Sequence, residues 1–128
     1  MTSETEKRAL ALKFLEALRS RNWIELRSVF TEDAVWHLPG ASKISGPADG
    51  VEAVVERARL IASYGLSFTL KHILIGKDGV ALSLNNTATR DGIVLDEHLA
   101  TVCQIRDGKI SRIDTYLSDV GMMDAFFV

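Results

Sequence analysis

The sequence predicts an α+β fold, a cone-shaped roll in which three N-terminal helices pack on a strongly curved, mostly antiparallel sheet. The first half of the 128 residues places apolar side chains at helical spacing, and the second half consists of β-rich runs separated by Asp-Gly pairs. Asp-Gly tolerates the positive φ angles of tight hairpin turns. A long antiparallel sheet must bury one face, and the helices are the available cover. We therefore expect a single domain over residues 1–128.

Three N-cap signals predict the three helices. Ser3, followed three residues later by Glu6, is typical of a capping box. Asn22 and Asp49 are each followed by a glutamate at the same spacing. Glycine at position 65 suits the left-handed cap that ends a helix. The helices are therefore expected over about 3–20, from 22 onward, and over about 49–64.

One early strand and a four-strand meander are expected to form the sheet. Pro39-Gly40 stops the early strand, and three Asp-Gly pairs, at 78–79, 91–92 and 107–108, predict the reversals of the meander. A bulge over 71–73 would switch the buried face of one strand. The expected strands are 33–38, 66–76, 80–90, 93–106 and 109–118, followed by a short apolar tail that ends in one helical turn.

Composition excludes several functional classes. The chain is 47% hydrophobic and 25% charged with a net charge of −2, so it has no electrostatic footprint for nucleic acid or an anionic membrane. No signal peptide or membrane span is evident, and a cytoplasmic location is the default. The single cysteine, Cys103, excludes an intrachain disulfide, and the three histidines lack metal-ligand spacing. We expect no metal and no cofactor.

Glu97 is the only acid on an otherwise apolar strand face, between Leu95 and Leu99. Burying an unpaired carboxylate is costly, and an apolar pocket would raise its pKa toward the range of a general acid or base. Two interpretations stand: Glu97 acts as an acid/base, or it lies hydrated at the rim or pairs with Arg90. Asn86 on the facing strand would either orient a ligand carbonyl or bond a neighbouring side chain.

Strand alternation separates the neighbours in "VWHLPG" (35–40). Successive side chains point to opposite faces, so Trp36 and Leu38 share one face and His37 lies on the other. We expect Trp36 and Leu38 to face the hollow between sheet and helices, and His37 to face away from it.

Three stretches resemble the nuclear-transport-factor-2-like superfamily, and most closely its SnoaL-like and ketosteroid-isomerase-like members. They are "KFLEALRSRNWIELRSVFTEDAVWHLPG" (13–40), "SGPADGVEAV" (45–54) and "CQIRDGKISRIDTYLSD" (103–119). With the meander they cover nearly the whole chain. The resemblance implies the fold, and it leaves the activity open because the superfamily contains isomerases, cyclases, hydrolases and proteins that are not enzymes.

The roles implied by the steroid isomerases fall on residues that cannot perform them. Those enzymes imply a tyrosine, an aspartate base and a protonated aspartate, and matching without gaps places these roles on Phe14, Leu38 and Thr101. The polyketide cyclases and limonene-epoxide hydrolases imply an aspartate where this chain has Thr115. The hydrolases also imply an Arg-x-Asp pair, at the positions of Asn86 and Ala88.

The expected site is therefore an apolar cavity for a small hydrophobic carbonyl or hydroxyl compound. One hypothesis is an enzyme of isomerase or cyclase type with Glu97 as acid/base; the alternative is a non-catalytic ligand-binding or dimerisation module. The expected cavity residues are Phe14, Trp36, Leu38, Asn86, Ala88, Leu99, Thr101, Ile113, Thr115 and Met122.

A homodimer is expected in either case, partly because the resemblance implies one. The outer face of the last strand would form its interface. The residues assigned to that face by strict alternation are Ile110, Arg112, Asp114 and Tyr116.

Overall fold

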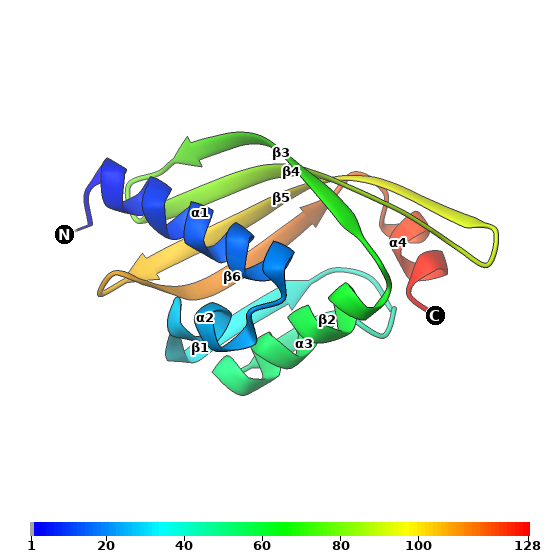
Figure 1. The fold of residues 1–128 in the computed structure, drawn as a ribbon, viewed down its shortest axis with the longest axis horizontal. Helices are drawn as coiled ribbons and strands as arrows, with labels where there is room; N and C mark the ends of the chain where they lie inside the picture. The colour runs from blue at the N-terminus through cyan, green and yellow to red at the C-terminus, as the bar shows by residue number, and fades with distance from the viewer. Residues whose placement is uncertain (1) are drawn as a thin grey trace.

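Three helices cover one face of a curved, unclosed six-stranded sheet, and a fourth closes one end (Figure 1). The structure is a computed structural model that describes residues 2–128. This arrangement confirms the predicted α+β class. The elements in chain order are α1 (Glu4–Ser20), α2 (Trp23–Ser28), β1 (Phe30–Leu38), β2 (Gly46–Asp49), α3 (Val51–Ser63), β3 (Ser67–Ile75), β4 (Gly79–Arg90), β5 (Ile93–Arg106), β6 (Lys109–Leu117) and α4 (Val120–Phe126).

The sheet has the strand order β2-β1-β6-β5-β4-β3. Strands β3 to β6 form the expected antiparallel meander, and β1 joins its edge parallel to β6. Strand β2 was not predicted, since four residues that include a proline give little signal. It pairs antiparallel with the end of β1, where Leu38 lies opposite Gly46.

Two of the three helix starts follow the predicted capping. The Ser3 hydroxyl accepts the Glu6 N–H, and the Glu6 carboxylate accepts the Ser3 N–H, which completes the capping box. Asn22 caps α2 through its side chain. The third prediction is wrong by one residue: Asp49 ends β2, and Gly50 stands at the N-cap of α3 without a side-chain bond.

The Asp-Gly pairs mark all three reversals, in two different ways. At Asp91-Gly92 and Asp107-Gly108 both residues have positive φ, as a type I′ hairpin turn requires. At the first pair the turn lies one step earlier, over Gly76–Gly79, and the Gly76 N–H donates to the Gly79 carbonyl. Gly79 therefore already belongs to β4.

Two bulges change which side chains face inward. The register between β3 and β4 shifts between Leu70 and His72, as the sequence predicts. A second shift, between Gln104 and Ile105 in the β5–β6 pairing, was not predicted. It turns Ile110 into the core, where it is 1% exposed, so its assignment to the outer face is wrong. A bulge adds a residue to one strand and thereby reverses the alternation beyond it.

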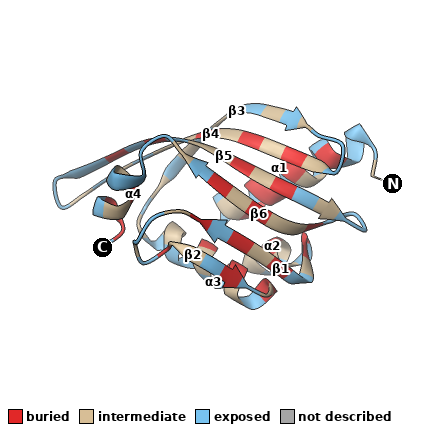
Figure 2. Cartoon of the chain, turned by 180° about the vertical axis from the view of Figure 1, so that it is seen from behind, coloured by how far each residue is buried: buried red, intermediate tan, exposed pale blue. Residues whose placement is uncertain are grey.

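Buried side chains alternate with half-buried ones along β4, and with exposed or half-buried ones along β5 (Figure 2). The buried set packs against α1, α2 and α3 and forms one continuous core. No helix within residues 2–128 has the length and apolar character to cross a membrane.

Candidate functional site

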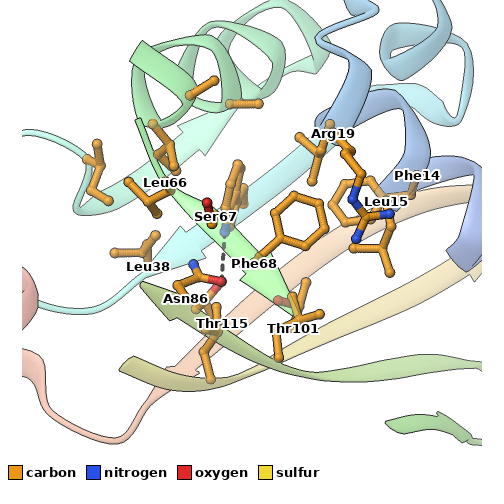
Figure 3. A pocket seen from close by; sticks show the side chains of 18 of the residues that line it. Phe14, Leu15, Arg19, Leu38, Leu66, Ser67, Phe68, Asn86, Thr101 and Thr115 are labelled. Carbon is orange, nitrogen blue, oxygen red and sulfur yellow. Dashed lines mark hydrogen bonds between the residues drawn. The ribbon is translucent and has the colours of Figure 1, made fainter. Parts of the chain in front are cut away.

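A pocket of about 470 Å³ lies between the inner face of the sheet and the helices (Figure 3). Strands β1, β3, β4, β5 and β6 contribute its sheet side, and α1 and α3 contribute the facing side. Most of the lining side chains are aliphatic or aromatic. Among them the polar groups are few and separate, which is typical of sites for small organic molecules.

Seven of the predicted cavity residues line this pocket together. They come from five different elements, as the alternation and the resemblance indicated, and His37 is exposed on the opposite side of β1. The seven are Phe14, Trp36, Leu38, Asn86, Leu99, Thr101 and Thr115.

Four other predicted residues, Ala88, Ile113, Met122 and Glu97, are not part of the lining. Ile113 lies in the closed core. The chain is helical at Met122, so Met123 points to the pocket in its place, and the Met122 sulfur accepts the Asp96 N–H instead. Glu97 is fully buried beside the pocket.

Sequence reasoning missed the side of the pocket formed by α3 and β3. Ala58, Ile61 and Ala62 of α3 and Phe68 of β3 all line it. The apolar spacing of α3 predicts burial, and it does not distinguish a core contact from a pocket contact. Only the position of α3 over the sheet makes that distinction.

Trp36 is held in place by polar contacts on two sides. Its indole N–H donates to the Thr115 hydroxyl at 2.9 Å, the bond drawn in Figure 3. Arg57 donates to the Trp36 carbonyl at 2.9 Å, and its guanidinium lies 5.4 Å from the indole centroid. Burial lowers the pKa of Arg57 from its ordinary value. The largest aromatic group of the pocket is thereby fixed in orientation.

Arg19 and Arg21 are the charged residues of the lining, and both are exposed. The Arg19 guanidinium lies 4.7 Å from the centre of the Phe68 ring, a cation–π contact. Arg21, in the left-handed conformation that ends α1, donates to the carbonyl of Ala62 at 3.0 Å. No Asp, Glu or His within the described part of the chain lines the pocket.

Asn86 supplies the most distinctive polar group of the pocket. Its side-chain oxygen is buried and has no hydrogen-bond partner within residues 2–128. A buried polar atom without a partner costs about 1–3 kcal/mol. Such an atom in a pocket points to a missing partner, either a ligand group or a proton on a neighbouring side chain.

Glu97 is 0% exposed, so the interpretation that placed it hydrated at the rim does not match the structure. Its Oε2 accepts the Ser118 hydroxyl at 2.9 Å and the Asp119 N–H at 3.0 Å. Burial raises the pKa of the Glu97 carboxyl, and these two hydrogen bonds act in the opposite direction. Its Oε1 has no partner among the described residues.

The expected partner Arg90 is directed elsewhere. Its guanidinium donates to the carbonyls of Phe126 and Val128, at 3.3 Å each, and lies 4.5 Å from the centre of the Tyr64 ring. It therefore ties the end of the chain to β4. Arg90 therefore does not form an ion pair with Glu97.

Cys103 and the acidic residues offer no second centre. Cys103 is buried, and burial raises the pKa of its thiol to about 12. No group of three or more His, Cys, Asp or Glu within residues 2–128 is placed to hold a metal ion.

A family model described as "SnoaL-like domain" matches residues 11–113. An uncharacterised protein of Mycobacterium tuberculosis is 27% identical over 107 residues, which cover 80% of this chain and 82% of that protein. The matched segment includes most of the pocket residues.

Solved structures share the whole architecture. Bal32a, from a soil-derived mobile gene cassette, superposes with a TM-score of 0.89 at 28% identity and covers 97% of this chain and 98% of its own. An NTF2-like protein from Burkholderia xenovorans superposes with a TM-score of 0.85 at 17% identity, with both chains fully covered. The second likeness concerns the fold alone.

Proposed function

The chain belongs to the SnoaL-like family, and from that premise we propose that it binds a small, mainly apolar molecule in the pocket under α1 and α3. One observation carries the proposal: a pocket of about 470 Å³ whose lining is mostly aliphatic and aromatic and includes a few separate polar side chains, among them Asn86. Pockets for small molecules typically measure about 300–1,000 Å³ and combine an apolar lining with a few placed polar groups.

The polar groups of the lining would orient the ligand, and the aromatic and aliphatic groups would supply the affinity. Thr115 accepts the Trp36 N–H, and its hydroxyl proton remains available to a ligand oxygen. Thr101 lies opposite Thr115 in the β5–β6 pairing, and Asn86 lies two rows farther along the sheet. These groups suit an apolar compound with one or two oxygen atoms.

Acid/base catalysis by Glu97 is the second candidate function. Its support is the raised pKa of the carboxyl and the free Oε1. The carboxyl does not line the pocket, so a proton would have to pass by way of Asn86 or after a side-chain movement. Proton transfer by a positioned carboxyl typically contributes about 10²–10⁴-fold.

A proton-exchange assay tests the catalytic candidate. In D₂O, acetyl-group exchange in 2-acetylnaphthalene reports proton removal next to a carbonyl. Exchange that the protein accelerates and that Glu97→Gln abolishes would support catalysis. Equal exchange with and without protein, or equal rates in wild type and variant, would leave binding as the function.

A blocked-pocket variant tests the binding proposal. Ala62→Phe places a ring inside the pocket, and Leu60→Phe places the same ring on the outer side of the same helix, where Leu60 is exposed. The probe is 1-anilinonaphthalene-8-sulfonate, whose fluorescence rises in apolar surroundings. We expect saturable binding to wild type and Leu60→Phe and its loss in Ala62→Phe. Equal binding by both variants would contradict the proposal.

We still expect the protein to be cytoplasmic and to form a homodimer in solution. The outer face of β6, without Ile110, supports the dimer. On that face Tyr116 is 65% exposed, and Arg112 and Asp114 form an ion pair. Light scattering should give twice the chain mass, and Tyr116→Glu should reduce it to one chain. A monomeric wild type would remove this expectation and leave the pocket proposal intact.

A further inference from the structure

Asn86 and Glu97 are direct cross-strand partners in the β4–β5 ladder. Both lie on the inner face of the sheet, and the Cβ atoms of directly opposed residues are about 4.5–5.5 Å apart. Phe68 of β3 pairs with Asn86 from the other side, so the three residues form one row. Phe68 and Asn86 line the pocket and Glu97 does not. Asn86 therefore stands between the ligand space and the carboxyl.

The two buried side-chain oxygens without a partner within residues 2–128 belong to this pair, Oδ1 of Asn86 and Oε1 of Glu97. Both atoms are hydrogen-bond acceptors when the carboxyl is ionised, so they cannot satisfy each other. A single proton on Oε1 would convert the pair into a donor and an acceptor. It would give each of the two buried oxygens a partner and remove the cost of leaving both without one.

We propose that Glu97 is a neutral carboxylic acid that donates from Oε1 to Oδ1 of Asn86 and thereby leaves the Asn86 NH₂ group to bind an acceptor oxygen of the ligand. This inference rests on the proposed ligand-binding function and specifies the ligand class: apolar ketones, quinones and ethers, whose oxygens only accept, in preference to the corresponding alcohols, whose hydroxyl proton would face the NH₂ group without an acceptor. Glu97 is a positioning residue in this scheme, because it fixes which end of the amide faces the pocket.

The surroundings of Glu97 favour the neutral form. Burial raises its pKa, and the adjacent Asp119 carboxylate adds to that effect, while Ser118, the Asp119 N–H and His98 lower it. On β4, Arg90 bonds the carbonyls of Phe126 and Val128. On α4, the Asp124 carboxylate accepts the Ala41 N–H. Asp96 accepts from Asn85 on the outer side of the sheet.

The same carboxyl also holds one wall of the pocket. Strand β6 ends opposite Leu99, so Glu97 lacks a strand neighbour on that side and faces the start of α4 instead. Its Oε2 accepts from Ser118 and Asp119, and Asp119 is the N-cap of α4. Helix α4 carries Met123 into the pocket lining. The pair therefore links the ligand-facing amide to the helix that closes the pocket.

An ionised Glu97 would require the opposite arrangement. The Asn86 amide would turn over, its NH₂ group would donate to Oε1, and its oxygen would face the pocket. The ligand would then need a hydroxyl or amine donor. The two arrangements differ in one proton and predict opposite ligand preferences, so they can be separated.

The first test needs no ligand. Isotope-edited infrared spectra of the full chain, wild type minus Glu97→Gln, should show the carbonyl stretch of a protonated acid at neutral pH. The Asn86 side-chain amide protons should shift in NMR as Glu97 titrates, which a purely structural role would not produce. A carboxylate band at neutral pH would overturn the inference, and so would Asn86 amide proton shifts that do not change as Glu97 titrates.

The second test compares a matched ligand pair, 2-acetylnaphthalene and 1-(2-naphthyl)ethanol. Wild type should prefer the ketone by about 2- to 10-fold, the worth of one hydrogen bond. Glu97→Gln keeps a donor toward Asn86 and should keep the preference, without the loss that wild type shows as pH rises past the Glu97 pKa. Asn86→Leu should bind both equally.

An alcohol preference in wild type, or an unchanged ketone preference in Asn86→Leu, would overturn the inference. The two tests also separate it from the function on which it rests. If the protonated acid is present and neither ligand binds, the proposed function fails and the proton assignment stands. If both ligands bind and Glu97 is ionised, the binding function stands and the inference fails.

Discussion

The two ends of the inner face of the sheet differ in their side chains and in how tightly these side chains pack. The closed end contains Val80, Leu82, Cys103 and Ile110, each at most 2% exposed. The pocket end contains Leu84, Asn86, Leu99 and Thr115, which line a space large enough for a small molecule. In the register, Leu82 pairs with Thr101, and this row is the boundary between the two ends.

The difference separates stability from function along a single strand. The closed end buries apolar side chains against α1 and supplies the packing that folds the domain. The pocket end leaves space unfilled and keeps polar oxygens out of water, and both features lower the stability of the fold. An arrangement that costs stability in one half of a sheet indicates a role for that half other than folding.

The same substitution at the two ends should have unequal effects. Leu82→Ala removes a side chain that is 0% exposed and leaves a new cavity, so we expect a loss of about 2–5 kcal/mol in the free energy of unfolding. Leu84→Ala, two residues along β4, widens an existing pocket and should cost clearly less. Urea denaturation of both variants measures the difference. Equal losses would mean that the pocket is filled in solution.

Removal of the Trp36–Thr115 hydrogen bond should have the next largest effect on stability. Thr115→Val keeps the side-chain shape and removes the acceptor of the buried indole N–H. We expect a loss of about 1–3 kcal/mol, the cost of an unpaired buried donor. Thr101→Val, at the other buried threonine of the pocket, serves as the control. A Thr115→Val variant as stable as wild type would show that water or another group receives this N–H.

Glu97 should make stability depend on pH in a definite direction. Because the folded-state pKa is raised, folding favours the protonated form, and its contribution is complete below the ordinary carboxyl pKa. As pH rises through the window between the unfolded and folded values, wild type should lose stability relative to Glu97→Gln, by about 1.4 kcal/mol for each unit of the shift. Thermal unfolding of both proteins across that window measures this difference. A gain in wild-type stability relative to Glu97→Gln as pH rises through that window would contradict the raised pKa.

The smallest effect concerns Cys103, which should be inert in the folded protein. The thiol is buried and its pKa is raised to about 12, so the reactive thiolate is scarce at neutral pH. A thiol reagent should react only as fast as the closed end opens, and Leu82→Ala should accelerate the reaction. Rapid reaction in native wild type would show that this end is less tightly closed than the structure indicates.

The fold could be predicted because its signals are local. The capping box at Ser3 and Glu6, the Asp-Gly turns and the alternation along β4 and β5 depend on neighbours in sequence. The same alternation placed Trp36 and Leu38 in the pocket and His37 outside it.

The errors arose where tertiary contacts override the pattern. A bulge between Gln104 and Ile105 turned Ile110 inward, and a helical turn in α4 exchanged Met122 for Met123. Glu97 was singled out as the one acid on an apolar strand face, since its neighbours are visible in the sequence, but its full burial was only one of the alternatives that the sequence left open. Its position behind Asn86 depends on where β6 ends and α4 begins, and no local signal reports that.

The most direct test of the central claim is a two-dimensional ¹H–¹⁵N NMR titration of the wild-type chain with 2-acetylnaphthalene. We expect saturable shifts in the Asn86 side-chain amide and in the backbone of Leu84 and Leu99, with Val80, Leu82 and Cys103 unchanged. The shifts should vanish in Ala62→Phe. Shifts of equal size at both ends of the sheet, or shifts that persist in the blocked variant, would contradict the claim that the pocket end is a binding site.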